Sequence, residues 1–151
     1  MKKFSLTDLL ISVITAELVG AVSGVIAGNF QVFYSQILKP PLSPPAIIFP
    51  VIWAILYALM GISSFIVKSK QPDGLKIYTI QLAVNFLWSI IFFRFKLFAL
   101  SAIISLILLI LVGIMIMRFR KINKISAAIN IPYLLWSAFA TYLAFAIYII
   151  N

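Results

Sequence analysis

The sequence predicts an all-α integral membrane protein: one domain, residues 1–151, built as a bundle of five transmembrane helices. The chain is 64% apolar and 10% charged, whereas soluble domains are about 45–50% apolar and about 25% charged. Five apolar runs each reach the roughly 17–25 residues that a helix needs to cross a bilayer core about 30 Å thick. The alternation of apolar and polar residues that is typical of membrane barrel strands is absent from these runs.

The predicted spans cover residues 9–27, 46–67, 75–93, 97–117 and 125–150. We expect the first run to stay as a permanent span, because it is longer than the apolar region of a secretion signal and lacks a clear cleavage site. The loops after spans two, three and four are very short, so the helices that they join are expected to be antiparallel neighbours.

Span one carries glycine at every fourth position, at Gly20, Gly24 and Gly28. Such a stripe forms a flat groove in which another helix backbone can approach closely. Two interpretations stay open: a homodimer interface, and packing within one bundle. Glu17 lies within about 60° of the same stripe, so we expect it to face protein rather than lipid, neutral or hydrogen-bonded.

Residues 30–45, between spans one and two, form a proline-rich loop that contains Pro40, Pro41, Pro44 and Pro45. Proline fixes φ and disfavours helix in the residue before it. The loop is therefore either a semi-rigid lid over one end of the bundle or a stiff connector.

Spans three and five each carry a stripe of polar side chains on one helix face. Lipid offers such groups no partner, so they must face neighbouring helices or a cavity. Hydrogen bonds between helices, worth on the order of 0.6 kcal/mol each, are the simpler interpretation. The stripes are Gln81, Asn85 and Ser89 in span three, and Ser126, Asn130, Ser137 and Thr141 in span five.

Two tryptophans stand in the middle of spans, away from the headgroup layer where tryptophan is common. Trp53 is followed by Tyr57 one turn later in span two. Span five presents Trp136, Phe139, Ala140 and Leu143 at helical spacing on one face. This pattern predicts an aromatic-lined cavity for a flat apolar ligand, with plain helix packing as the alternative.

The distribution of lysine and arginine predicts that the N-terminus lies inside and the C-terminus outside a bacterial plasma membrane. In that orientation three basic residues, Lys39, Arg94 and Lys96, lie outside. The nine inside are Lys2, Lys3, Lys68, Lys70, Lys76, Arg118, Arg120, Lys121 and Lys124. The net charge of +9 then belongs to residues that flank spans, and no nucleic-acid partner is expected.

Several kinds of chemistry are excluded by composition. The chain has no cysteine and no histidine, so it offers neither a disulfide nor the usual ligands and nucleophiles of zinc and thiol enzymes. Phosphate-binding glycine motifs, serine-hydrolase motifs and paired carboxylates are also absent. We therefore expect no metal and no cofactor.

Four motifs follow one another along the chain: YSQILKPPLSPP at 34–45, FPVIWAILYALMG at 49–61, QLAVNFLWSIIFF at 81–93 and PYLLWSAFATYL at 132–143. In this order they resemble the motifs of the TspO/MBR family, the tryptophan-rich sensory proteins related to the mitochondrial translocator protein. Five spans with a proline-rich first loop are also the architecture of that family.

The resemblance implies a cavity beneath the first loop that binds porphyrins such as protoporphyrin IX, and also isoquinoline and benzodiazepine drugs. It implies a sensor, carrier or regulator of porphyrin levels, or alternatively an enzyme that degrades porphyrin in light, with Trp53 and Trp136 as the reactive residues. A homodimer is expected. The residues that the motifs imply for the pocket are Tyr34, Pro44, Trp53, Tyr57, Asn85, Phe92, Trp136, Phe139, Ala140 and Leu143.

Three positions depart from the family pattern. Leu42 stands where the loop usually has tryptophan, Phe33 replaces an aromatic that is often tryptophan, and Ala144 replaces a common asparagine. No basic residue follows Tyr142 or Tyr148 as the sterol-recognition pattern of the animal proteins requires. Cholesterol binding is therefore not expected.

Overall fold

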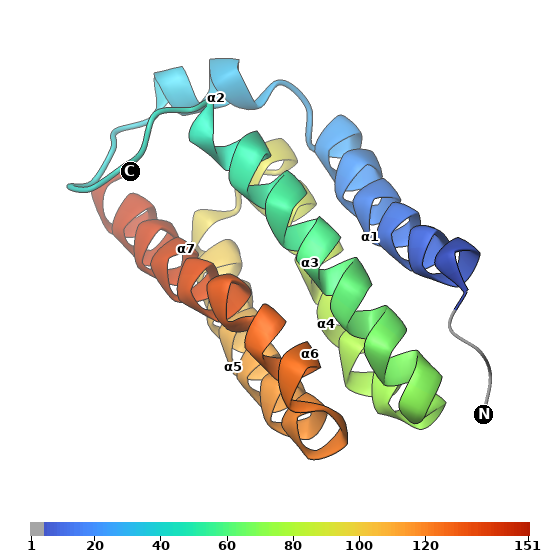
Figure 1. The fold of residues 1–151 in the computed structure, drawn as a ribbon. Helices are drawn as coiled ribbons and strands as arrows, with labels where there is room; N and C mark the ends of the chain where they lie inside the picture. Colours follow the sequence, from blue (N-terminus) through green and yellow to red (C-terminus); the bar gives the residue numbers. More distant parts are fainter. Residues whose placement is uncertain (1–4) are drawn as a thin grey trace.

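The computed structural model describes residues 5–151, and within them the protein is a bundle of five long helices without strands (Figure 1). All five are long and apolar enough to cross a membrane, with η2 completing the third span and α6 the fifth. This confirms the predicted all-α bundle of five membrane helices. The long helices are α1 (Leu6–Ala27), α3 (Ile48–Lys70), α4 (Leu75–Ser89), α5 (Phe98–Ile122) and α7 (Ile131–Ile150).

Four shorter elements connect or extend the long helices. Helix α2 (Phe30–Gln36) and the 3₁₀ turn η1 (Pro72–Gly74) lie between spans, and the π-helical turn η2 (Ile90–Arg94) continues α4. Helix α6 (Lys124–Ile129) is a short helix that leads into α7. In Figure 1, α2 crosses one end of the bundle, close to the C-terminus, whereas the N-terminal end of α1 lies at the other.

Helix α2 occupies the first half of the segment that the sequence indicated as a loop. The Asn29 side chain caps it by accepting a hydrogen bond from the Val32 amide at 3.2 Å, the role that asparagine commonly plays at a helix N-terminus. Gly28 has a φ of +94°, a conformation that glycine adopts most readily, and so lets the chain turn from α1 into α2. The prolines follow α2 and hold the second half of the segment non-helical.

The half of the bundle away from α2 is densely filled. Val67 on α3 and Val112, Met115 and Phe119 on α5 are fully buried there. Gly61 on α3 lies against the backbone of α1, because a Cβ atom at this position would lie 2.5 Å from the Cα atom of Val13. The absence of a side chain at Gly61 is thus what allows α1 and α3 to pack backbone to backbone.

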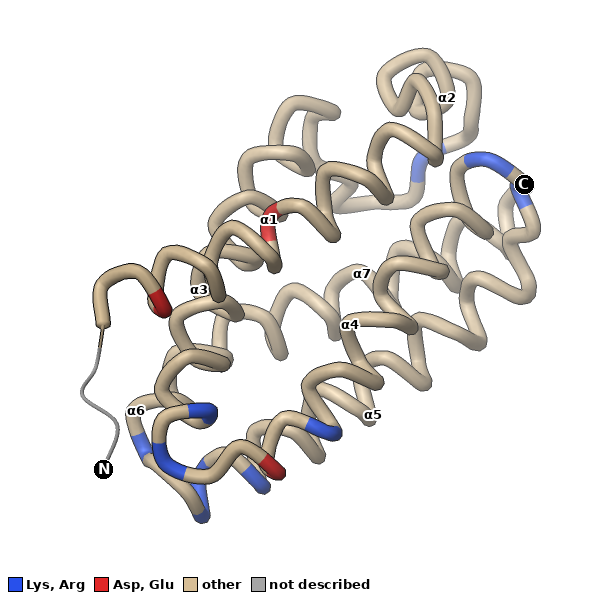
Figure 2. The backbone as a smooth tube through the Cα atoms, turned by 90° about the vertical axis from the view of Figure 1, so that its right-hand side faces the viewer, with Lys and Arg blue, Asp and Glu red and all other residues tan. Residues whose placement is uncertain are grey.

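The outward-facing surfaces are apolar, as a bilayer requires. Along α1 the exposed side chains include Leu10, Ile14, Leu18 and Val25. Among the described residues, most of the lysine and arginine positions lie at the end of the bundle opposite α2, and Lys39, Arg94 and Lys96 lie at the α2 end (Figure 2). The end opposite α2 carries Lys68, Lys70, Lys76, Arg118, Arg120, Lys121 and Lys124, whereas Lys2 and Lys3, also counted in the sequence analysis, lie outside the described residues.

Candidate functional site

A cavity of about 600 Å³ lies in the half of the bundle beneath α2. This volume falls within the range of about 300–1,000 Å³ that is usual for small-molecule sites. Five α-helices, the π turn η2 and two connecting segments contribute to its wall. The lining residues are Glu17, Gly20, Ala21, Gly24, Ala27, Gly28, Asn29, Phe30, Gln31, Ala46, Phe49, Pro50, Trp53, Ala54, Tyr57, Trp88, Ser89, Phe93, Trp136 and Ala140.

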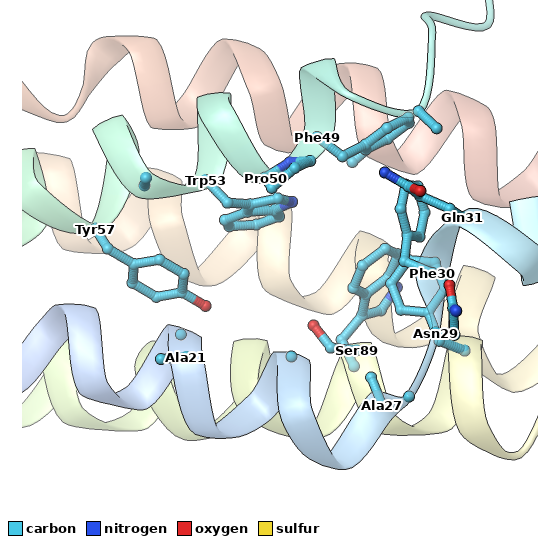
Figure 3. A pocket seen from close by; sticks show the side chains of 18 of the residues that line it. Ala21, Ala27, Asn29, Phe30, Gln31, Phe49, Pro50, Trp53, Tyr57 and Ser89 are labelled. Atoms are coloured by element: carbon cyan, nitrogen blue, oxygen red, sulfur yellow. The ribbon is translucent and has the colours of Figure 1, made fainter.

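Aromatic rings form much of this wall (Figure 3). On α3 the rings of Trp53 and Tyr57 lie one turn apart, with their centroids 5.6 Å from each other. Phe49, one turn before Trp53, packs edge to face against Trp136 of α7 at 5.7 Å and against Phe30 of α2 at 5.0 Å. Helices α2, α3 and α7 therefore meet through rings, and these rings present large apolar faces to the cavity.

Small residues of α1 form the opposite wall. Gly20, Gly24 and Gly28 all line the cavity, and a Cβ atom added at Gly24 would meet no other atom within 4 Å. A Cβ atom at Gly20 would instead collide with the Tyr57 ring. The glycine stripe thus makes room for the cavity and for Tyr57, whereas the close helix contact is made at Gly61.

Tyr57 is held from below by a buried hydrogen-bond network. Its hydroxyl donates to Asn85 Oδ1 at 3.2 Å, and Asn85 Nδ2 donates to the Tyr133 hydroxyl at 2.8 Å. Tyr133 in turn donates to Gln81 Oε1 at 2.7 Å, and Gln81 Nε2 lies 3.7 Å from the Met60 sulfur. Asn85 and Gln81 are fully buried, so this part of the polar stripe joins α3, α4 and α7 behind Tyr57, the member of the network that lines the cavity.

The loop closes over the cavity through Tyr34. Its hydroxyl donates a hydrogen bond to the Pro44 carbonyl at 2.5 Å, and Lys39 Nζ lies 4.9 Å from the centre of its ring. Burial raises the pKa of the Tyr34 phenol above its usual value, and a side-chain hydrogen bond with Ser43 offsets part of this rise. Tyr34 and Pro44 do not themselves line the cavity, but the Tyr34 ring supports Phe30 and Phe49, which do.

Further side chains fasten the loop from α7. The Tyr142 hydroxyl donates to the Pro41 carbonyl at 2.8 Å. The Asn151 side chain accepts from the Leu38 amide at 2.9 Å and donates to the Leu38 carbonyl at 3.0 Å. Leu42, which replaces the family's tryptophan, is 80% exposed and lies away from the cavity.

The π-helical turn sets which phenylalanine of α4 and η2 reaches the cavity. Phe93 lines it, whereas Phe92 stacks on Trp88 with ring centroids 5.2 Å apart. Phe92 and Leu143 are both buried in a second apolar cluster that includes Phe33. The extra residue in a π turn rotates the side chains that follow it, and such turns are frequent at functional sites.

The structure therefore divides the sequence-derived pocket residues into three groups. Trp53, Tyr57, Trp136 and Ala140 line the cavity. Phe139 lines a separate, lipid-facing groove between α3 and α7, of which Trp136 also forms part. The residues that support the cavity from behind are Tyr34, Pro44, Asn85, Phe92 and Leu143.

Other lining residues were not singled out from the sequence. With 13 phenylalanines and seven prolines in the chain, composition alone does not distinguish the ones that line the cavity. These are Phe30, Phe49, Phe93 and Pro50. Phe49 lies one turn before Trp53, so the helical spacing already noted for Trp53 and Tyr57 was the signal that could have revealed it. Phe93 had no such signal, because a regular helix from Trp88 brings Phe92 to the same face instead.

The sequence profile of the TspO/MBR family matches residues 12–149 of the chain. The chain belongs to the TspO/MBR family. It is 34% identical over 134 residues to the "Tryptophan-rich protein TspO" of Bacillus cereus, a match that covers 86% of this chain and 88% of that protein.

Two further members of the family are similar over most of their length. The "Tryptophan-rich sensory protein" of Cereibacter sphaeroides is 31% identical over 115 residues, 75% of this chain and 73% of that protein. The human "Translocator protein" is 29% identical over 125 residues, 77% of this chain and 73% of that protein. A TspO/MBR protein with five apolar membrane helices is an integral membrane protein, and the lipid bilayer is its environment.

Proposed function

We propose that this TspO/MBR protein binds a flat tetrapyrrole of the protoporphyrin IX type in the cavity beneath α2, and acts as a sensor, carrier or regulator of porphyrin levels. The observation that carries the proposal is the shape and lining of the cavity: about 600 Å³, with the indoles of Trp53, Trp88 and Trp136 in its wall. Flat apolar molecules gain most from such rigid aromatic faces.

Titration with protoporphyrin IX tests the proposal directly. Trp53, Trp88 and Trp136 are the three tryptophans of the chain, and each lines the cavity. We therefore expect a bound porphyrin to quench nearly all of the tryptophan fluorescence of the purified protein, with saturation at one ligand per chain. Quenching that rises linearly with porphyrin concentration and does not saturate would indicate partition of the porphyrin into lipid, and it would contradict binding in the cavity.

The same cavity is expected to accept isoquinoline and benzodiazepine drugs, which are smaller flat apolar molecules. Competition with protoporphyrin IX in the fluorescence titration would show whether the two kinds of ligand share it.

We expect metal-free porphyrin to bind at least as well as haem. Haem iron is usually held by His, Cys, Met or Tyr, and the chain lacks His and Cys. Met60 is fully buried with its sulfur beside Gln81 Nε2, and the Tyr57 hydroxyl donates to Asn85. A tight haem complex with the spectrum of six-coordinate iron would contradict this expectation.

A second candidate function is light-dependent degradation of the porphyrin. The position of Trp53 and Trp136 in the cavity wall favours it, because an indole is a far better electron donor to an excited porphyrin than a phenyl ring. Illumination of the bound complex should then give products that free porphyrin does not give. We expect Trp53→Phe and Trp136→Phe to slow this conversion strongly, and full conversion by both variants would exclude these donors.

We also propose the orientation and association expected from the sequence. In the proposed orientation the basic end of the bundle lies on the cytoplasmic side of a bacterial plasma membrane. Helix α2 and the cavity beneath it then lie toward the outer side. Labelling of single cysteines from either side of the membrane tests this, and external labelling near Lys70 would contradict it. The homodimer is tested by cross-linking in native membranes. Gly24→Leu should weaken the dimer if the glycine stripe of α1 contributes to the interface, and an unchanged dimer would assign these glycines, which line the cavity, to the interior of one bundle.

A further inference from the structure

The cavity contains a feature that a porphyrin site does not need. Glu17 is the one charged side chain among the described residues that line it. It lies near the middle of the 22-residue helix α1, at a depth where lipid offers a carboxylate no partner and a charge is costly. An ionisable residue in such a place indicates a function more often than a structural role.

No residue among 5–151 makes a hydrogen bond or ion pair with the Glu17 carboxylate. Tyr57 also lines the cavity, but its hydroxyl donates a hydrogen bond to Asn85 Oδ1 and not to Glu17. The buried network of tyrosine and amide groups is therefore complete without Glu17. Glu17 lines the cavity, and its carboxylate has no donor among the described residues.

The surroundings of Glu17 are those of a cation site. Trp53 lines the cavity from α3, and the Tyr57 ring packs against Gly20, one turn after Glu17 on α1. Aromatic faces attract ammonium and related cations. Lysine and arginine side chains are absent from the described lining. At the α2 end of the cavity the lining includes the neutral amides of Asn29 and Gln31, so the acidic side chain and these amides lie toward opposite ends of the cavity.

We propose that Glu17 makes this cavity select flat apolar ligands that carry a cationic nitrogen, held between the Glu17 carboxylate and the aromatic faces of Trp53 and Tyr57. The inference rests on the proposed function, because it uses the same cavity. It also fixes an orientation for a tetrapyrrole: the carboxylate side chains of protoporphyrin IX point away from Glu17, toward Asn29 and Gln31.

Two probes of nearly equal shape test the proposal. At pH 7, 9-aminoacridine is a planar cation and acridine is planar and neutral, and both are fluorescent. We expect the protein, in nanodiscs of phosphatidylcholine, to bind 9-aminoacridine about ten-fold more tightly than acridine, the size of a charge-assisted hydrogen bond in a partly buried site. Empty nanodiscs give the partition of each probe into lipid, which is subtracted.

Glu17→Gln keeps the size of the side chain and removes its charge. This variant should lose the ten-fold preference, whereas Glu17→Asp should keep part of it. Asp8→Asn is the matched control, because Asp8 is the acidic residue of the first turn of α1 and does not line the cavity. The control should bind both probes as the unmodified protein does.

Protoporphyrin IX provides a readout of opposite sign. Removing the negative charge should strengthen binding of this anionic ligand several-fold in Glu17→Gln, while the same change weakens binding of 9-aminoacridine. A variant that is merely misfolded would lose affinity for both ligands. The opposite signs therefore separate a role in selecting ligand charge from a role in stability.

Equal binding of the two acridines by the unmodified protein would overturn the inference, and so would equal shifts in Glu17→Gln and Asp8→Asn. The proposed function has a separate test, because it fails if protoporphyrin IX neither binds nor displaces acridine. Preference for 9-aminoacridine without any porphyrin binding would support the charge selection and reject the tetrapyrrole.

Discussion

The two halves of the bundle are filled in different ways. The half with the basic end is packed by fully buried side chains such as Val67, Met115 and Phe119. The half beneath α2 encloses about 600 Å³ between the small residues of α1 and the aromatic rings of α3 and α7. The network from Tyr57 to Gln81 separates them. The same five helices thus provide stability at one end and ligand space at the other.

The glycines show most clearly how the halves differ. Gly61 belongs to the packed half and lies against the backbone of α1, whereas Gly24 belongs to the open half and has free space in front of its Cα atom. A glycine in a membrane helix can serve close packing or can leave a cavity open. The difference is measurable, because the two roles predict opposite responses to the addition of a methyl group.

Gly61→Ala is expected to have the largest effect of the changes considered. The new Cβ atom would lie 2.5 Å from Val13 Cα and 2.9 Å from the Ser12 carbonyl oxygen. These are backbone atoms, so α1 as a whole must move, and we expect a loss of about 3 kcal/mol in stability. Thermal unfolding in detergent, followed by circular dichroism, measures it.

Gly24→Ala is the matched control for that experiment. The added methyl group meets open space, and alanine is the better helix former by about 1 kcal/mol. The midpoint of unfolding should therefore stay the same or rise slightly. Equal destabilisation by the two substitutions would mean that the halves do not differ in packing as described.

The number and order of the spans could be predicted from the sequence, because length and hydropathy alone decide whether a helix can cross a bilayer. Helix α2 could not be predicted, since its seven residues lie between a span and a proline-rich segment and carry no long periodic pattern. The cap at Asn29 was the local signal, but an asparagine alone is also common in loops.

The sequence predicted which helix faces line the cavity, but not which side chains contact one another across neighbouring helices. Regular helical spacing placed Trp53, Tyr57, Trp136 and Ala140 on faces that do line the cavity. Asn85 was on the correct face of α4, but whether its amide pairs with tyrosines or faces a ligand depends on a neighbouring helix. Phe92 was expected in the pocket from the motif resemblance, but it stacks on Trp88, and Phe93, which follows it in the π turn, lines the cavity.

Asn85→Ala should have the next largest effect, because it removes the centre of the network between the two halves. The hydroxyl groups of Tyr57 and Tyr133 would each lose a partner in a buried place, and an unsatisfied buried polar group costs about 1–3 kcal/mol. We expect a loss of about 2 kcal/mol in the unfolding experiment. Ser89→Ala, one turn further along the same face but lining the cavity, should leave the unfolding midpoint unchanged, and an equal loss there would contradict the assignment of the network.

Gly24→Leu tests the open half by filling it. The larger side chain extends into the cavity, where a Cβ atom meets nothing within 4 Å. We expect protoporphyrin IX affinity to fall at least about ten-fold, equivalent to about 1.4 kcal/mol, while the unfolding midpoint changes little. Gly113→Leu on α5 is the control, since it too meets no atom within 4 Å but does not line the cavity. Unchanged porphyrin affinity in Gly24→Leu would place the ligand elsewhere.

The tryptophans give the smallest effects and the finest comparison. The Trp88 indole donates to the Ser101 carbonyl at 3.1 Å, so Trp88→Phe should cost about 1 kcal/mol of stability by losing that hydrogen bond. Trp136 Nε1 is buried without a hydrogen-bond partner among the described residues, so Trp136→Phe removes an unsatisfied donor and should leave stability unchanged or slightly higher. Its effect should appear in porphyrin binding instead, as a loss of about 0.5–1.5 kcal/mol from the smaller ring face. Fluorescence titration and thermal unfolding of both variants measure the two quantities, and a Trp136→Phe protein that loses stability but binds porphyrin normally would assign its indole to helix packing.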